Sequence, residues 1–386
     1  MNILLVSTAY WPHPCGGSEH VYYLSRGLKS RGHKVTILTT NYSKYGECCE
    51  LPDIKVIRVG RALMLQINKG TSPFSWGFFV PYEVKKILRA GQYDIVHLHS
   101  CYPLELGFWA LIFSQSINVL TPHTVGFRRS PIYSLGARLF RKYAKKIHGH
   151  IYVSNLARIW NAPYYPGDFR IIPNGVDTVR FSPQVPPFPR PQDRFIILYL
   201  GRLDHKKGIM VLLEAVKKLK PQHPEILVYI IGKGPLRKAA QQYLDKNNLS
   251  ETCHFLGYVA RDDIPRYYRT ADLYVAPTLG AEALGIVLLE ALASGTPTIA
   301  SKIGGYDEVI CDSENGLFFK PGCADDLAAK ISAVITNKEL RQKLSENARL
   351  RALEFSWEKI VKEVEDYYYY LIQRFSAQAN FNKAIS

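Results

Sequence analysis

Short apolar runs alternate with helical patterns along the first half of the chain. Runs of strand length occupy residues 2–10, 33–40, 54–60, 93–99, 117–123 and 148–154. Between the first two, Val21, Leu24 and Leu28 recur at helical spacing within residues 18–32. Strands that alternate with helices favour parallel pairing, so this half predicts an open, doubly wound sheet.

The same rhythm restarts in the second half. Strands are expected at residues 194–201, 226–232, 253–259, 272–278 and 297–301, and helices at 208–220, 234–248, 285–295 and 325–337. Residues 182–193, SPQVPPFPRPQD, hold five prolines in twelve positions, and we expect a linker there because proline fixes its backbone angle and donates no hydrogen bond.

The pattern therefore predicts an α/β protein with two Rossmann-like, doubly wound domains that face each other across a cleft. We expect residues 1–182 to form the first domain and residues 183–366 the second. A last helical pattern covers residues 356–375, and the C-terminal helix, about residues 367–386, is expected to return to the first domain. Ligands of such sheets bind at the carboxyl ends of the strands, which places the expected site in the cleft.

Composition fits this picture. The 386 residues are enough for two domains, and 47% hydrophobic with 21% charged residues indicates a globular chain. The opening MNILLVSTAY has no basic flank and predicts a first strand, not a signal peptide. No apolar run reaches the roughly 18 residues of a spanning helix, so we expect a cytosolic protein. Seven cysteines without a CxxC pair indicate reduced thiols.

The net charge of +16 is unevenly shared. Residues 1–175 hold 21 Lys and Arg against 8 Asp and Glu, a net charge of +13, whereas the rest holds 28 against 25, a net charge of +3. A basic half suits an anionic partner, which can be a nucleic acid, an acidic lipid or a charged small molecule.

The first candidate for chemistry is YLGRLDHKKG, residues 199–208. A predicted strand ends there and is followed by Arg202, Lys206 and Lys207, with Gly208 opening a helix. A forked cation and a point cation beside a helix start suit a diphosphate. The alternative is a solvated basic turn.

Two weaker signals lie in the first half. In HPCGGSEH, residues 13–20, Gly16 and Gly17 allow close ligand approach, and Ser18 is placed to cap the following helix. The third glycine of a dinucleotide fingerprint is missing, which argues against NAD. His123, in TPHTVGF, follows a strand, where it can serve as acid, base or donor, or only as a structural hydrogen bonder.

The stretch EALGIVLLE places Glu282 and Glu290 at the two ends of an apolar run that contains Gly285. Two carboxylates suit a glycosidase. Arg202 and Lys207 argue against that reading, because a glycosidase has no diphosphate to hold. A sugar nucleotide explains both sets, with Glu282 on one sugar, Glu290 on the other and the helix start at Gly285 on the phosphates.

Several motifs together resemble retaining glycosyltransferases of family 4, the glycosyl transferases group 1, which have the GT-B architecture. They are the glycine pair, RGHKVTILT, DIVHLH, IPNGVD, GRLDHKKG, IGKGP, FLGYV and EALGIVLLEALASGTPTIAS. The chain is most similar to the phosphatidylinositol mannosyltransferases of that family, which share a histidine followed by threonine, here His123 and Thr124.

The resemblance implies a role for each matching residue. Arg202 and Lys207 would hold the donor diphosphate, Glu282 the transferred sugar and Glu290 the ribose. His123 would lie at the reaction centre, Gly17 beside the phosphate and acceptor, and Tyr258 and Val259 near the base. The remaining implied donor-binding residues are Gly16, Gly232, Leu284, Gly285, Ile286 and Val287. Leu284 stands where relatives usually have an aromatic residue, which leaves the sugar preference open. Such enzymes retain the anomeric configuration and need no metal or other cofactor.

Two basic helical patterns bear on the acceptor. Residues 80–92 place Val84, Ile87 and Leu88 at helical spacing beside basic residues, and residues 128–148 carry a second basic cluster. Each suits an anionic bilayer surface, as the related mannosyltransferases imply, or an ordinary packed helix with a solvated face. We find no nucleic-acid module and expect no nucleic-acid partner.

The sequence thus predicts a cytoplasmic enzyme, peripheral to the inner face of the membrane, that moves a hexose to a lipid-linked or polyol acceptor. Mannose from GDP-mannose is the expected donor. One alternative is a UDP-sugar enzyme acting on a polysaccharide or soluble acceptor, and the other is a non-catalytic sugar or nucleotide binder.

Overall fold

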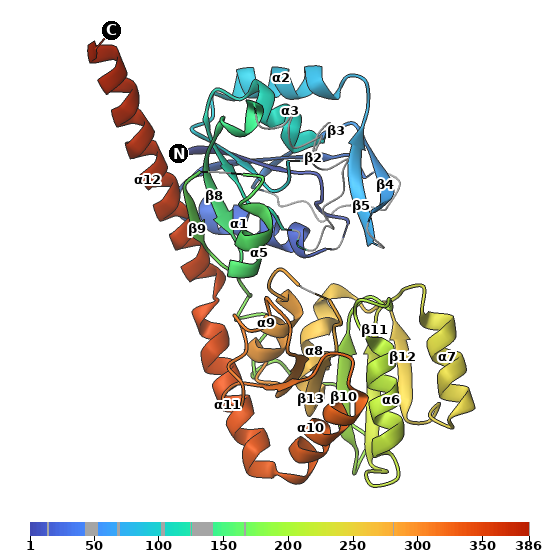
Figure 1. The fold of residues 1–386 in the computed structure, drawn as a ribbon. Coiled ribbons are helices and arrows are strands. Elements are labelled where there is room, and N and C mark those ends of the chain that lie inside the picture. The colour runs from blue at the N-terminus through green and yellow to red at the C-terminus, as the bar shows by residue number, and fades with distance from the viewer. Residues whose placement is uncertain are drawn as a thin grey trace. The chain divides into compact units, whose positions relative to one another are not determined.

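The computed structural model describes residues 1–13, 15–42, 53–67, 70–101, 105–123, 125, 142–165, 167–280 and 282–385. The chain divides into two compact units (Figure 1), Met1–Asn174 with Trp357–Ser386, and Gly175–Ser356. We call them unit 1 and unit 2. We expected the two crossings at 182/183 and near 366/367, and the structure has them at 174/175 and 356/357.

Unit 1 is built on a seven-stranded parallel sheet in the order β3-β2-β1-β6-β7-β8-β9. The strands are β1 (Asn2–Ser7), β2 (Lys34–Thr40), β3 (Lys55–Val59), β6 (Ile95–Leu98), β7 (Ile117–Leu120), β8 (Ile147–Tyr152) and β9 (Phe169–Ile171). An antiparallel hairpin that the sequence pattern did not predict, β4 (Arg61–Ile67) and β5 (Gly70–Trp76), stands apart from this sheet.

Helices cover both faces of this sheet, because successive side chains of a strand point to opposite faces. On β1, Ile3 and Leu5 pack with α1 (Gly16–Ser30) and α12 (Trp357–Ile385), whereas Leu4 and Val6 pack with α2 (Val80–Gly91) and α3 (Leu106–Phe113). A short helix, α5 (Asn155–Asn161), follows β8. The continuous apolar runs of the strands are therefore explained by burial on both sides.

Helix α12 lies alongside α1 and completes the core of unit 1 (Figure 1). Its buried side chains form one apolar stripe at helical spacing, made of Trp357, Ile360, Val361, Val364, Tyr367, Tyr368 and Leu371. At the polar edge of the stripe, Glu365 pairs with Arg31 and His33, which follow α1. The first unit is thus assembled from both ends of the chain.

Unit 2 repeats the plan with a six-stranded parallel sheet in the order β12-β11-β10-β13-β14-β15. The strands are β10 (Phe195–Leu200), β11 (Ile226–Ile231), β12 (Cys253–Gly257), β13 (Leu273–Ala276), β14 (Thr298–Ser301) and β15 (Leu317–Phe319). The helices are α6 (Ile209–Leu219), α7 (Arg237–Lys246), the 3-10 helix η2 (Arg261–Asp263), α8 (Ile264–Thr270), α9 (Ile286–Ala293), α10 (Ala324–Thr336) and α11 (Lys338–Glu354).

Both sheets have the Rossmann strand order, in which the first strand lies between the second and the fourth. The order reverses between β1 and β6 in unit 1 and between β10 and β13 in unit 2. At such a switch point the loops leave the sheet in opposite directions and open a crevice at the carboxyl ends of the strands. The rule therefore predicts that ligands bind at the loops after β1 and β6 in unit 1, and at the loops after β10 and β13 in unit 2.

The proline-rich segment 182–193 is part of unit 2 and packs within it. The backbone N–H of Phe188 donates to Thr270 Oγ1 at 2.9 Å, and the Phe188 ring lies 4.7 Å from that of Tyr267. Proline prevents regular backbone hydrogen bonding, but it does not prevent side chains from packing on a domain. The proline content of residues 182–193 therefore did not show where the chain passes from unit 1 to unit 2, which is at 174/175.

Two further expectations concern single features. The predicted cap of α1 at Ser18 is wrong, because the helix begins at Gly16 with Cys15 at its N-cap, and Ser18 instead donates to the carbonyl of His13. The cysteines among the described residues, 15, 101, 253, 311 and 323, are free thiols. Across the described part of the chain, no helix combines the length and apolar character that a bilayer span requires.

Candidate functional site

The carboxyl edge of the sheet in unit 2 gathers most of the predicted donor-binding residues. Arg202 and Lys207 follow β10, Gly232 follows β11, Tyr258 and Val259 follow β12, and residues 282–287 follow β13. Parallel strands present these loops at one edge, and the loops after β10 and β13 flank the switch point. The second-unit residues that the sequence singled out thus belong to one edge of one sheet.

Ion pairs connect the two loops at the switch point. Glu282 Oε1 lies 2.9 Å from Lys206 Nζ and 3.1 Å from Lys207 Nζ. Burial alone would raise the pKa of Glu282, but the two ammonium groups outweigh it and leave the pKa below its ordinary value. Glu282 is therefore ionised at neutral pH, and the two lysines share one carboxylate.

Asp204 organises the cationic loop. Its Oδ1 accepts the backbone N–H of Lys207 at 3.0 Å, and its Oδ2 lies 3.3 Å from Arg202 Nε. The guanidinium of Arg202 remains about half exposed, with 49% of its side-chain surface accessible. The three cations outnumber Asp204 and Glu282, so the edge retains a positive charge that suits an anion.

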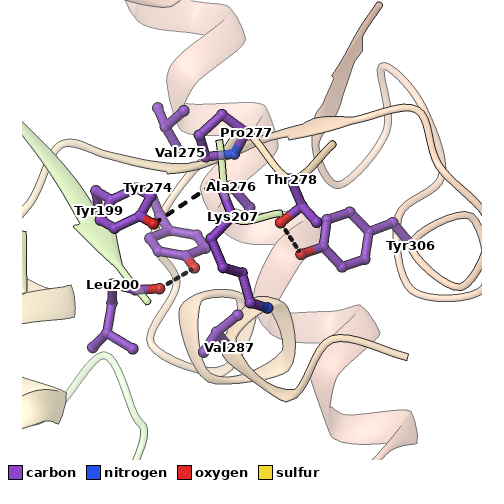
Figure 2. A pocket seen from close by; sticks show the side chains of 10 residues that line it. All are labelled: Tyr199, Leu200, Lys207, Tyr274, Val275, Ala276, Pro277, Thr278, Val287 and Tyr306. Atoms are coloured by element: carbon purple, nitrogen blue, oxygen red, sulfur yellow. Dashed lines mark hydrogen bonds between the residues drawn. The ribbon is translucent and has the colours of Figure 1, made fainter. Parts of the chain in front are cut away.

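A small pocket lies beside Lys207 (Figure 2). It is lined by Tyr199, Leu200, Lys207, Tyr274, Val275, Ala276, Pro277, Thr278, Val287 and Tyr306. Three tyrosine hydroxyls brace its walls: Tyr199 donates to the Arg202 carbonyl at 2.9 Å, Tyr274 donates to the Leu200 carbonyl at 3.4 Å, and Tyr306 bonds Thr278 at 2.9 Å. Figure 2 shows the Lys207 side chain extending toward Val287, in the first turn of α9.

The start of α9 depends on Gly285. This residue is the N-cap, with a φ of 89° that other residues rarely adopt, and a Cβ there would lie 2.5 Å from Tyr306 Cε1. The first backbone N–H groups of a helix have no partner within the helix and bind anions well. Val287, in that first turn, lines the same pocket as Lys207. A cation and a helix start therefore share one pocket.

The other predicted residues of unit 2 differ in their exposure and in their contacts. Glu290 Oε2 accepts the hydroxyl of Tyr268 at 3.1 Å, which fixes its carboxylate on α9. Tyr258 is exposed beside Lys233, whose Nζ lies 5.6 Å from the ring centroid. Gly232 has no room for a side chain, because a Cβ would lie 1.9 Å from the Gly201 carbonyl oxygen. Leu284 is only 1% exposed, so its side chain belongs to the core.

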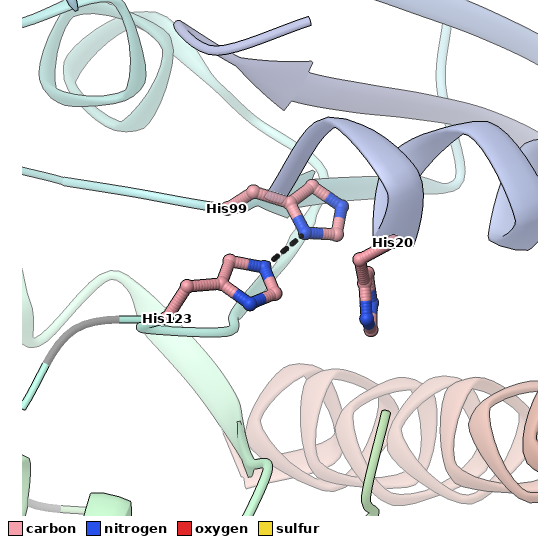
Figure 3. A group of neighbouring side chains, drawn as sticks. All are labelled: His20, His99 and His123. Atoms are coloured by element: carbon pink, nitrogen blue, oxygen red, sulfur yellow. Dashed lines mark hydrogen bonds between the residues drawn. The ribbon is translucent and has the colours of Figure 1, made fainter. Parts of the chain in front are cut away.

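A second group lies at the carboxyl edge of the sheet in unit 1. His123 follows β7 and joins His99, which follows β6, and His20 on α1 (Figure 3). His99 Nδ1 and His123 Nε2 are 3.1 Å apart, and His20 Nδ1 lies 2.8 Å from Asn174 Oδ1. Gly16 and Gly17 form the first turn of α1, on the same helix as His20.

The sequence identified His123 but not its two partners. The available signals were the histidines of DIVHLH and of GGSEH, each at an end of a predicted strand or helix. Burial lowers the pKa of His20 to about 4, and burial together with the neighbouring histidines lowers the pKa values of His99 and His123 well below 6.5. All three imidazoles are neutral at physiological pH.

The basic helix predicted at residues 80–92 exists, as α2, but its apolar face is used inside unit 1. Val84 and Leu88 are buried in the core, and Ile87 packs against it. Exposed aromatic side chains lie before this helix and in its first turn: Trp76 at 56%, Phe78 at 90%, Phe79 at 75% and Tyr82 at 69% exposure. We call these four residues the aromatic ridge. Most of the second basic cluster, residues 128–148, lies outside the described residues.

Comparison with known families gives matches over both units. The family model described as Glycosyltransferase Family 4 matches residues 14–180, and the model described as Glycosyl transferases group 1 matches residues 183–351. Together the two models span nearly the whole chain.

Two relatives are similar along nearly their whole length. The chain is 32% identical over 367 residues to a phosphatidyl-myo-inositol mannosyltransferase of Mycolicibacterium smegmatis, covering 94% of this chain and 92% of the relative. It is 27% identical over 408 residues to the alpha-monoglucosyldiacylglycerol synthase of Acholeplasma laidlawii, covering 98% of this chain and all of the relative.

Among solved structures, sucrose-phosphate synthase from Thermosynechococcus elongatus superposes with a TM-score of 0.79. The sequence identity is 23%, and the match covers 97% of this chain and 99% of the other. This likeness concerns the fold. It confirms the predicted GT-B architecture with two Rossmann-like domains.

Proposed function

Since this chain belongs to family 4 of the glycosyltransferases, we propose that it transfers mannose from GDP-mannose to a lipid-linked or polyol acceptor, with retention of configuration and without a metal. The named relatives act on mannose with phosphatidyl-myo-inositol and on glucose with diacylglycerol, judging by their names. Both names combine a hexose with a lipid, which favours a lipid-borne acceptor here.

The ion pairs of Glu282 carry the proposal. In the free protein, Glu282 forms ion pairs with both Lys206 and Lys207. A donor diphosphate carries two negative charges and replaces Glu282 as the partner of these lysines, aided by Arg202 and the start of α9. The released carboxylate then accepts hydrogen bonds from the hydroxyls of the transferred sugar. Glu290, fixed by Tyr268, holds the ribose.

We propose a transfer step with retention of configuration. The bond between sugar C1 and the diphosphate oxygen breaks while the acceptor hydroxyl oxygen bonds to C1 from the same face. The acceptor's proton passes to the departing diphosphate. Negative charge builds on the leaving group, so preorganised cations supply the main stabilisation. We assign His123 the role that the family resemblance implies, a hydrogen bond to the donor sugar from a neutral imidazole that adds no charge.

A transfer assay with GDP-mannose and a phosphatidylinositol acceptor tests this function. Lys207→Ala and Glu282→Gln should each lower kcat/KM by about a hundredfold to a thousandfold, as losing one preorganised contact to a developing charge does. Lys246→Ala, in the last turn of α7, and Glu251→Gln are matched controls and should retain the wild-type rate. Retained turnover in both site variants would contradict the site assignment.

The donor is tested by the same assay with UDP-glucose in place of GDP-mannose. The structural likeness to sucrose-phosphate synthase keeps a soluble acceptor as the second candidate function. Faster donor hydrolysis with UDP-glucose, with transfer to a soluble sugar, would favour that alternative. Binding of both nucleotides without turnover of either would indicate a non-catalytic binder.

The aromatic ridge supports contact with an anionic bilayer. Aromatic side chains insert at the level of the lipid headgroups, and Lys86 and Arg89 on α2 add about 1 kcal/mol each near an anionic leaflet. The apolar face of α2 is buried, so the ridge and not that face would enter the interface. We accordingly place the enzyme at the cytoplasmic face of the membrane, as a peripheral protein.

Pelleting with vesicles of phosphatidylcholine and phosphatidylglycerol tests the surface. The double variant Phe78→Ser with Phe79→Ser should lose binding, and salt should weaken binding of the wild type. Val179→Ser removes an exposed apolar side chain of unit 2 and serves as the control. Unchanged pelleting of the double variant, or tighter binding to duplex DNA than to vesicles, would refute the membrane assignment.

A further inference from the structure

The three histidines of unit 1 form a group with the spacing of a metal-ion site. One ring nitrogen from each of His20, His99 and His123 lies within 4.8 Å of the others (Figure 3). In a tetrahedral zinc site, bonds of about 2.0–2.1 Å place ligand nitrogens roughly 3.3–3.4 Å apart. Small side-chain rotations would bring the group to that spacing.

Two ring nitrogens of this group have no hydrogen-bond partner in the part of the chain that the structure describes. Nε2 of His20 and Nε2 of His99 are buried and accept no hydrogen bond from any described residue. His20 Nδ1 faces the amide oxygen of Asn174, which only accepts, so Nδ1 carries the hydrogen and Nε2 keeps its lone pair. A metal-ligating histidine usually donates its other ring N–H to an oxygen acceptor such as a carboxylate or a carbonyl, and Asn174 Oδ1 is an oxygen acceptor of this kind.

His97 shows by contrast what a satisfied histidine looks like in this core. Its Nδ1 lies 2.6 Å from the Tyr368 hydroxyl and its Nε2 lies 2.7 Å from Thr121 Oγ1, so both nitrogens are occupied. In the neighbouring group, a contact between rings joins His99 Nδ1 and His123 Nε2, and metal binding through either of these two atoms would replace it.

The ligand chemistry of the group favours a transition-metal cation. Histidine binds metal ions through a ring nitrogen of its neutral imidazole. Imidazole nitrogen selects zinc, copper, nickel and cobalt over magnesium and calcium, which prefer oxygen. The chemistry therefore specifies a divalent transition metal.

We infer that His20, His99 and His123 bind a divalent transition metal such as Zn²⁺, and that the bound ion inhibits the enzyme. The inhibitory part rests on the proposed function, in which His123 gives the donor sugar a hydrogen bond. A metal held by His123 occupies that ring nitrogen, so the hydrogen bond to the sugar is lost. The proposed transfer step uses no metal, so the ion acts only as an inhibitor.

Metal binding is measured without any activity assay, by calorimetric titration of EDTA-treated protein with Zn²⁺ and by the visible absorption of bound Co²⁺. Wild type should bind one ion, and Co²⁺ should give the spectrum of a four-coordinate nitrogen site. His20→Gln and His99→Gln should each weaken binding by about a hundredfold or more, and Asn174→Ala by roughly tenfold to a hundredfold through loss of the orienting amide. His254→Gln, on the surface of unit 2, is the control.

Several results would overturn the inference. They are the absence of a stoichiometric Zn²⁺ site, equal affinity in wild type and both histidine variants, and a near-ultraviolet thiolate band in the Co²⁺ spectrum, which would assign the ion to cysteine. Circular dichroism of each metal-free variant establishes that it is folded before it is titrated.

The inhibitory part has its own readout. Zn²⁺ should abolish mannose transfer at the concentration that fills the site, and Mg²⁺ should not. A protein that binds Zn²⁺ but transfers no mannose would refute the proposed function and leave the metal site intact. A protein that transfers mannose at full rate with the site filled would refute the inhibition.

Discussion

At the scale of single residues, buried histidines make the stability of unit 1 depend on pH. Burial lowers the pKa of His20 from 6.5 to about 4. Between these values the unfolded chain binds a proton that the folded chain does not, so stability is complete above pH 6.5 and declines as the pH falls toward 4. For His20 the total loss is on the order of 3 kcal/mol.

Urea unfolding of wild type and His20→Gln between pH 7 and pH 4 measures this effect. Relative to the variant, the wild type should lose roughly 3 kcal/mol over that interval, because the variant has no imidazole to protonate. His254→Gln should follow the wild-type curve. Parallel curves for wild type and His20→Gln would mean that His20 is not held neutral by burial.

Residue types at strand ends were predictable from sequence, but their pairings were not. The loops after β10 and β13 identified Lys207 and Glu282 as candidates, because a short motif follows each strand. Their ion pair, and the contribution of Lys206, depend on side-chain geometry across two distant loops. The grouping of His20 and His99 with His123 was missed for the same reason, since no local pattern links three separate segments.

At the scale of elements, Gly285 determines how α9 begins. Gly285→Ala would combine a left-handed backbone angle with a contact to Tyr306 at 2.5 Å, and should cost unit 2 more than about 2 kcal/mol of stability. Gly257 has a φ of 72° and nothing within 4 Å of a Cβ, so Gly257→Ala should cost only about 1 kcal/mol.

Urea unfolding of the two variants compares these costs directly. The Gly285 variant should also bind GDP more weakly, because a shifted first turn no longer presents its N–H groups to the diphosphate. Equal destabilisation by both substitutions would show that the Tyr306 ring moves aside at little energetic cost. The positive φ of Gly285 would then account for the whole loss of stability.

Most strands and helices were predictable because unit 1 and unit 2 are built from long apolar runs and clear helical repeats. Two of the exceptions have identifiable causes. The hairpin was missed because β5, GTSPFSW, holds glycine, serine and proline and resembles a loop, although β4, RALMLQI, carries an apolar run. Helix α2 resembled a membrane-surface helix because sequence alone does not show which partner covers an apolar face. Val84 and Leu88 are covered by unit 1 itself.

At the scale of the whole molecule, α12 makes the first unit depend on the end of the chain. A chain that ends after residue 356 lacks the apolar stripe of α12 and exposes the core around Val21, Leu24 and Leu28. Burial of each such side chain contributes about 1.5–3 kcal/mol, so unit 1 should not fold without the helix. Unit 2 has its own core and should remain folded.

Hydrogen exchange followed by mass spectrometry distinguishes the two units in one experiment. Truncation after residue 356 should remove protection from β1, β2 and β6 while β10 and β11 stay protected. A chain that ends after residue 375 keeps the whole apolar stripe and is the control. Protected strands in unit 1 of the shorter chain would contradict the role given to α12.

The central claim is that the cations after β10 hold a nucleoside diphosphate, and calorimetric titration with GDP tests it most directly. Wild type should bind GDP, and Lys207→Ala should bind it about tenfold to a hundredfold more weakly, since a charge-assisted hydrogen bond contributes about 1.5–3 kcal/mol. Lys246→Ala should bind as wild type does. Equal GDP affinity in wild type and Lys207→Ala would contradict the account.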